Sequence, residues 1–257
     1  MLLALLTTVI AQLPDGGMPP RGLSCLPTWY AGEVVYEEDG GWGLELQDGG
    51  FIAWAHQPGE PVEADGGSLV TTLSDVYRVP YVSGVIVPVP TSDAGIDDPG
   101  RERVELLMRA TYGNDEDEVM EHLARVRFFG LRWPFHELAA PALERVVGRL
   151  QPLIKKNPKL LPFLRDIGGT FIWRRIARSK NLSTHSWAIA IDINTDKAHY
   201  WRWATPREPI VWANKIPQEI VDAFEAEGFI WGGRWLHYDT MHFEYRPELL
   251  SPECKEK

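Results

Sequence analysis

The sequence of 257 residues lacks several features that would quickly assign a class of protein. It has two cysteines, Cys25 and Cys254, which are too few and too far apart to form a Cys-based metal cluster. They could pair in an oxidising compartment or remain free thiols, and both alternatives stay open. No run of about 18 apolar residues is present, so we expect no membrane-spanning helix.

Positive charge is also scarce. The chain has 26 Lys and Arg against 36 Asp and Glu, which gives a net charge of −10. Nucleic-acid binding needs a basic face that neutralises phosphates, so we expect no nucleic-acid partner. Tryptophan, in contrast, is abundant, with eleven residues. In a folded protein these side chains fill the core or line a groove.

The N-terminus begins with an apolar stretch, Met1 to Ala11, which is followed by a segment rich in Pro and Gly. This pattern resembles the end of a secretory signal, although the basic residues that normally precede such a stretch are missing. A buried first strand or helix is the alternative. We therefore treat residues 1–20 as a possible leader.

Short strand-like runs separated by glycine pairs fill the next part of the chain. The expected strands are 33–36, 43–46, 51–55 and 82–89, with hairpin turns at the glycine pairs 40–41, 49–50 and 66–67. Residues 91–100 are polar and rich in turn formers, which is typical of a linker. The pattern predicts a small β-rich accessory module over residues 21–100, to which we assign no chemistry.

Helical periodicity dominates the rest of the chain. The expected helices are 101–110, 116–125, 138–153 and 218–227, and the expected strands are 127–131, 170–176, 187–193 and 241–245. The fold class predicted for residues 101–257 is α+β, with helices packed on a small antiparallel sheet.

Two segments carry residues suited to metal chemistry. The first contains His185 and Asp192, and the second, about fifty residues later, contains His242. A single histidine or aspartate is usually structural, but two imidazoles and one carboxylate with an open fourth position are typical of catalytic zinc. Only a folded domain can bring such distant residues together.

Backbone geometry adds a constraint on this set. Seven residues of straight strand would place His185 and Asp192 about 23 Å apart and on opposite faces. A turn must therefore fold His185 back over the strand that carries Asp192. Along that strand the small Ala188 and Ala190 share the face of Asp192, which leaves room for a metal there.

Both segments resemble the metal-site signatures of the M15 peptidases. The family pattern is Ser-x-His-x-x-Gly-x-Ala-x-Asp, followed downstream by an acidic residue, two variable residues, His and often Phe-Glu. The likeness extends from about residue 135 to residue 247. One departure is Ala188, which stands where the family has glycine. If that position has a positive φ, alanine costs about 1 kcal/mol or more there.

The resemblance implies a role for individual residues. It makes His185, Asp192 and His242 the zinc ligands. It makes Asp239 the general base, Arg174 the residue that stabilises the oxyanion, and Ser183 a residue close to the substrate. Arg175 is the alternative to Arg174, and strand alternation sends the two side chains to opposite faces.

Other residues were assigned from their position alone. We expect Trp231 to contact substrate, together with Trp187 and Trp235, although core packing is the alternative for all three. Glu244 lies two residues past His242 on the same strand face, so we expect it to support that ligand. His237 is interpreted as an ordinary loop histidine, with contact to the substrate as the alternative.

The resemblance implies zinc-dependent hydrolysis of a peptide bond in peptidoglycan stem or cross-link peptides. Either a D-alanyl-D-alanine carboxypeptidase or an endopeptidase fits. The alternative is a non-catalytic zinc-containing module that binds cell wall. A bacterial periplasmic or secreted location follows from the substrate.

Overall fold

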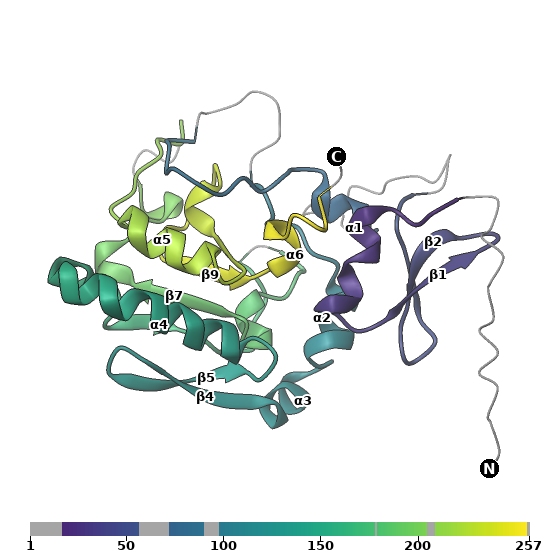
Figure 1. The fold of residues 1–257 in the computed structure, drawn as a ribbon, viewed down its shortest axis with the longest axis horizontal. Helices are drawn as coiled ribbons and strands as arrows, with labels where there is room; N and C mark the ends of the chain where they lie inside the picture. The colour runs from purple at the N-terminus through teal and green to yellow at the C-terminus, as the bar shows by residue number, and fades with distance from the viewer. Residues whose placement is uncertain (1–16, 57–71, 90–97, 178, 205–208, 256–257) are drawn as a thin grey trace, which may run out of the picture.

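The computed structural model describes residues 17–56, 72–89, 98–177, 179–204 and 209–255. The fold is α+β, as predicted, with small antiparallel sheets and helices packed against them (Figure 1). The glycine pair 66–67, most of the possible leader and most of the expected linker lie outside the described residues. No helix in the described parts of the chain is long and apolar enough to cross a membrane.

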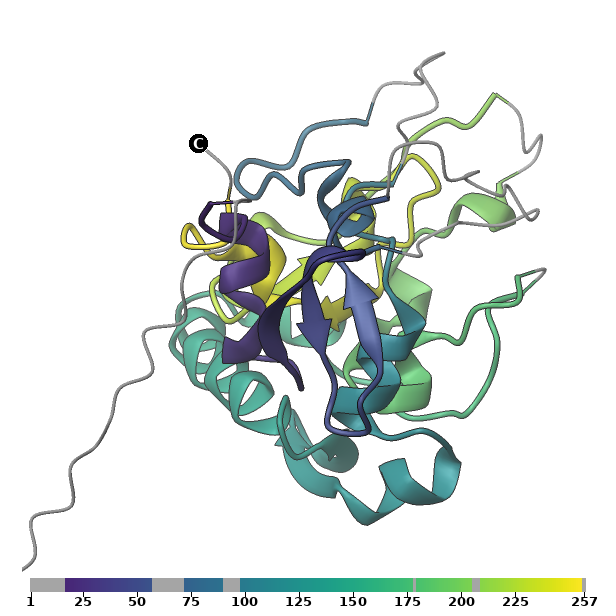
Figure 2. The ribbon, with the colours of Figure 1, turned by 90° about the vertical axis from the view of Figure 1, so that its right-hand side faces the viewer.

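The N-terminal part forms a three-stranded antiparallel sheet that faces the viewer in Figure 2. Its elements are α1 (Arg21–Ser24), β1 (Glu33–Glu37), β2 (Gly41–Glu45) and β3 (Phe51–Ala53). The predicted strand at 82–89 is wrong. Its backbone bonds with side chains instead of a neighbouring strand, since the Ile86 amide donates to Gln218 Oε1 at 2.6 Å.

The middle of the chain contains α2 (Glu105–Tyr112), α3 (Glu116–Glu121), β4 (Leu123–Phe128), β5 (Leu131–His136) and α4 (Ala140–Lys156). The helix expected over 116–125 begins as predicted, where Asp115 caps it by accepting a bond from the Glu118 amide. It ends four residues early, because the chain becomes extended from Leu123 and pairs with β5. Residues 101–104 are likewise not helical, so α2 starts later than expected.

A four-stranded antiparallel sheet of order β6-β7-β9-β8 lies next to α4 and α5. Its strands are β6 (Ile167–Gly169), β7 (Ala190–Asn194), β8 (Phe229–Trp231) and β9 (His242–Tyr245), and α5 (Gln218–Glu225) precedes β8. The chain continues from β9 into the short helix α6 (Pro247–Leu250). The strand expected at 170–176 lies earlier, at β6. All three residues of β8 are buried, so it shows no alternation that would predict it.

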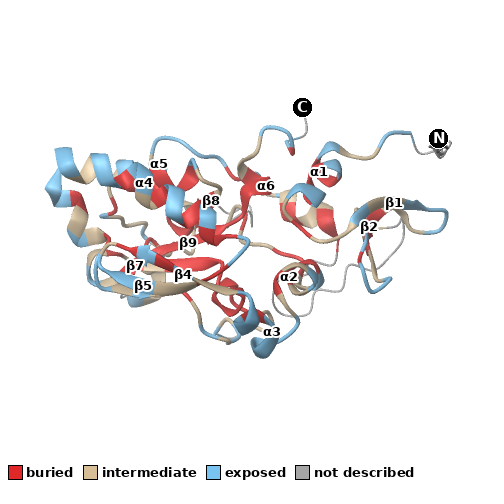
Figure 3. Ribbon diagram, turned by 60° about the horizontal axis from the view of Figure 1, so that its bottom comes forward, coloured by how far each residue is buried: buried red, intermediate tan, exposed pale blue. Residues whose placement is uncertain are grey.

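One face of this sheet is packed with apolar side chains. Ile191, Phe243 and Phe224 are fully buried, and the rings of Phe224 and Phe243 stack with their centroids 4.0 Å apart. The inner side of α4 closes the core, and its outer side is exposed (Figure 3). The opposite face is thereby left for the polar side chains.

The two ends of the chain are tied together. Cys25 and Cys254 form a disulfide. The Tyr30 hydroxyl donates to Glu248 at 2.7 Å, and one continuous cluster of buried apolar residues runs through both parts of the chain. The division into an accessory module over 21–100 and a catalytic domain over 101–257 stays a prediction.

Candidate metal centre

A tight turn brings His185 to the sheet. Residues Thr184–Trp187 form a 3₁₀ turn, η4, in which Ser183 Oγ accepts a bond from the His185 amide. Ala188 ends the turn in the left-handed conformation, with φ +51° and ψ +36°. This is the reversal that the spacing of His185 and Asp192 requires. The position where the family has glycine does have a positive φ.

Strand pairing brings the other two residues together. In the antiparallel pair β7–β9, Asp192 lies directly opposite His242, and Ala190 lies directly opposite Glu244. Residues that face each other in such a pair point to the same side of the sheet. The small Ala190 side chain therefore leaves space for Glu244 beside His242.

Three donor atoms converge at this place. His185 Nε2 is 3.2 Å from Asp192 Oδ1 and 3.3 Å from His242 Nδ1, and His242 Nδ1 is 2.9 Å from Asp192 Oδ1. Ligands bound to a tetrahedral zinc at about 2.0–2.1 Å are about 3.3 Å apart. The triangle therefore has nearly the size that such an ion needs. Within the described residues this set forms a cluster able to hold a metal ion.

In each histidine the outer ring nitrogen, which points away from the cluster, is hydrogen-bonded. His185 Nδ1 donates to the Thr170 carbonyl at 3.2 Å, and His242 Nε2 donates to Glu244 at 3.0 Å. In the neutral form of each ring, this bond places the hydrogen on the outer nitrogen and leaves a lone pair on the inner one. Partners of this kind fix the tautomer and orientation of histidines that bind metals.

The charges around the cluster favour a cation. Burial alone would raise the pKa of Asp192, but His185 and His242 hold it well below its usual range. Burial alone would lower the pKa of His242, but its hydrogen bonds with Asp192 and Glu244 raise it to about 10. The site therefore stabilises positive charge between two carboxylates, as a divalent ion requires.

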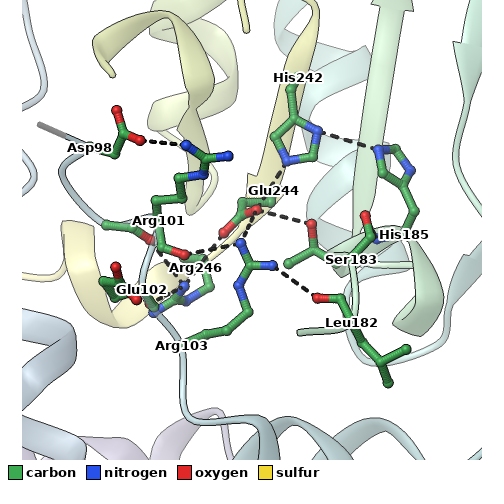
Figure 4. Close-up of polar contacts among 12 residues, drawn as sticks. Asp98, Arg101, Glu102, Arg103, Leu182, Ser183, His185, His242, Glu244 and Arg246 are labelled. Carbon is green, nitrogen blue, oxygen red and sulfur yellow. Dashed lines mark hydrogen bonds and ion pairs between the residues drawn. The ribbon is translucent and has the colours of Figure 1, made fainter. Parts of the chain in front are cut away.

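Glu244 is fully buried behind His242 (Figure 4). The Thr184 hydroxyl donates to it at 3.0 Å, and Arg103 and Arg246 lie 3.6 and 3.4 Å from its oxygens. With its bond to His242 Nε2, these contacts place Glu244 where it can support that ligand. The two arginines were not expected from the sequence. The spacing of Arg101 and Arg103 could have indicated that both share one face of an extended segment.

Asp239 lies at the rim of the same cluster. Its amide donates to the Gly232 carbonyl at 3.0 Å, while its Oδ1 is buried without a hydrogen-bond partner among the described residues. Burial and the nearby Asp192 raise the pKa of Asp239 to about 7. A buried oxygen without a partner is costly in a folded protein, and such groups concentrate at functional sites.

A cavity of about 110 Å³ is lined by the three residues of the cluster and by their neighbours. The sequence-predicted residues on its wall are His185, Asp192, His242, Asp239, Arg174, Ser183, Glu244 and Trp235. His237, which was interpreted as a loop histidine, lies on this wall as well. Tyr200 and Arg101 also line it, and no sequence motif had indicated either residue. Arg175 forms a backbone bridge with Leu182 instead and is not on this wall.

The assignment of Trp231 to substrate binding is not supported by its position. Its side chain is fully buried, stacks on Phe243 and donates through Nε1 to the Thr240 carbonyl at 2.9 Å. Trp187 is fully buried as well. Both are core residues, Trp231 on β8 and Trp187 at the end of the turn η4. Of the three tryptophans, Trp235 alone reaches the cavity, with its ring 5.7 Å from that of His242.

Comparison with known proteins agrees with this site. A family model described as D-alanyl-D-alanine carboxypeptidase matches residues 177–245, which include His185, Asp192, Asp239 and His242. This match supports membership of the M15 peptidase family and a metallopeptidase. No curated protein and no solved structure matches the chain.

The turn at Ala188 can be tested by stability. Ala188→Gly should change the free energy of unfolding by less than about 1 kcal/mol, because relief of the left-handed strain offsets the lost methyl burial. Ala188→Val should cost more than about 2 kcal/mol, because a branched side chain resists positive φ and overfills the core. Urea denaturation measures both. An Ala188→Val protein as stable as the parent would contradict the turn.

The support of His242 by Glu244 gives a second prediction. Glu244→Ala should lower the free energy of unfolding by about 3–5 kcal/mol, because it leaves the buried Arg103 without its carboxylate and removes one of the two carboxylates that pair with Arg246. Metal affinity should fall about 10–100-fold, because His242 loses the group that orients it. Denaturation and metal titration would measure these effects.

Glu227→Ala is the matched control, since Glu227 pairs with two half-exposed arginines, Arg145 and Arg149. It should cost at most about 1 kcal/mol and leave metal affinity unchanged. Equal effects of the two substitutions would contradict the role given to Glu244.

Proposed function

We propose that the protein is a zinc-dependent hydrolase of peptide bonds in peptidoglycan stem or cross-link peptides. The observation that carries the proposal is the triangle formed by His185, Asp192 and His242, which lies inside the family-matched segment. His185 Nε2, His242 Nδ1 and a carboxylate oxygen of Asp192 would hold the ion. When bound, zinc supplies a Lewis acid that polarises a carbonyl and makes water a better nucleophile near neutral pH.

The protein's own residues would supply the remaining steps. Asp239 would accept the proton of the attacking water through its unpartnered oxygen and deliver it to the leaving amine. A pKa raised towards 7 suits this task, because a base is most effective when its pKa lies near the working pH. Arg174, on the same cavity wall, would stabilise the negative oxygen of the tetrahedral intermediate. Ser183 would contact the substrate backbone.

We further propose a periplasmic or secreted location. Peptidoglycan lies outside the cytoplasm, and the disulfide between Cys25 and Cys254 is of the kind that persists in oxidising compartments. The alternative of a non-catalytic zinc-containing wall-binding module would need neither a buried base nor an arginine on the cavity wall. Hydrolysis of wall peptides by the zinc-loaded protein distinguishes the two.

The role of Asp239 gives the third prediction. Asp239→Asn keeps the shape of the side chain but removes the base, so kcat/KM on D-alanyl-D-alanine peptides should fall about 10²–10⁴-fold. Zinc content should not change, and the melting temperature should not fall, because a buried carboxylate without a partner is removed. The exposed Asp196 offers a matched control, Asp196→Asn, which should retain full activity.

Two results would reject this role. If Asp239→Asn loses its zinc, Asp239 is a ligand and another group is the base. If it keeps both zinc and full activity, the proposed proton transfer is wrong. Absence of hydrolysis by the zinc-loaded parent protein would reject the proposed function itself.

A further inference from the structure

A second and larger cavity, of about 370 Å³, adjoins the metal centre. The two cavities share wall residues, namely Arg101, Arg103, Ile176, Ala177 and His237. They are therefore parts of one continuous groove. The larger part is built mainly from residues 98–103 and 201–202, and the first of these segments lies outside the family-matched region.

This part of the groove carries one arginine, Arg202, that pairs with no described carboxylate, whereas Arg101 pairs with Asp98 and Arg103 with Glu244. Its wall holds Arg101, Arg103 and Arg202 against Asp98 and Glu102. Asp98 is already engaged, because it accepts bonds from the His237 amide at 2.9 Å and its ring at 3.0 Å and pairs with Arg101. Burial raises the pKa of Glu102 above its ordinary value. A local cationic wall stands out in a chain of net charge −10.

Arg202 has no acceptor of its own within the described part of the chain. It forms no ion pair there, its Nε is buried without a hydrogen-bond partner, and its guanidinium packs on the Trp201 ring at 5.0 Å. Trp201 Nε1 and Arg103 Nε also lack partners among these residues. All three groups donate and none accepts. The wall therefore has donors and cations for which the described residues supply no acceptor.

The Trp201 ring holds this wall in place. It contacts the His237 ring edge-on, with centroids 4.7 Å apart, and His237 is fixed in turn by Asp98. A guanidinium that packs on an aromatic ring loses little freedom when it binds a planar carboxylate. The arrangement is thus preorganised for a carboxylate.

We propose that the larger cavity binds a free carboxylate of the peptide substrate, with Arg202 as the recognising cation and Arg101 on the same wall. This inference rests on the proposed function and narrows its substrate to peptides with a free C-terminal carboxylate. A volume of about 370 Å³ accommodates one or two amino-acid residues of a ligand. The scissile bond would then lie next to a C-terminal residue. The groove is accordingly that of a carboxypeptidase rather than an endopeptidase.

Binding of matched ligands tests the proposal without depending on hydrolysis. The ligands are N-acetyl-D-alanine and its C-terminal amide, which differ only in the charge of the carboxyl group. Titration calorimetry on the zinc-loaded protein should show about 10-fold or tighter binding of the acid. In Arg202→Gln the ratio of the two affinities should fall close to one. Arg132→Gln removes an exposed arginine on β5, far from the cavity wall, and should keep the parent ratio.

Melting temperatures establish that each variant is folded, and Arg101→Gln provides a second substitution at the same wall. Equal affinity of the parent protein for acid and amide would overturn the subsite. A parent ratio that persists in both Arg202→Gln and Arg101→Gln would also overturn it. If the acid is preferred and Arg202→Gln abolishes this preference, the subsite stands even where no hydrolysis is found, and the proposed function alone fails.

Discussion

The pairing register of β7 and β9 is the constraint on which the candidate metal centre depends. It sets Asp192 directly opposite His242 and puts both side chains on the face away from the apolar core. A slip of one residue would turn one of them into the core, where Phe243 and Ile191 now lie. The packing of those side chains against the helices therefore fixes the distance between two ligand atoms. The left-handed turn at Ala188 then brings the third ligand residue, His185, to the other two.

Behind the ligands, buried charge replaces apolar packing. Glu244 holds His242 on one side and is balanced by Arg103 and Arg246, neither of which lies in the family-matched segment. Arg246 also donates to the Gly100 and Glu102 carbonyls, which fixes the segment that carries Arg101. Such networks cost free energy when broken and define one arrangement of the groups they hold. The groove wall and the ligand set are thereby parts of one structure.

The sequence predicted the features that depend on local pattern. The α+β class, the helix at α4 and the need for a turn after His185 follow from periodicity and spacing, and the structure confirms them. The features it could not predict depend on long-range contacts. Trp231 was assigned to the groove because composition does not show which face of a short buried strand points inward. Arg103, Tyr200 and Arg202 reach the site from segments with no motif, and only the folded chain brings them there.

The central claim is that His185, Asp192 and His242 together hold one zinc ion. Crystals of the zinc-loaded protein, measured on both sides of the zinc absorption edge, test it most directly. The account predicts a single anomalous peak about 2.0–2.1 Å from His185 Nε2, His242 Nδ1 and an oxygen of Asp192. A peak bound by Asp239 or Glu244 in place of one of these, or no peak in this cavity, would contradict the account.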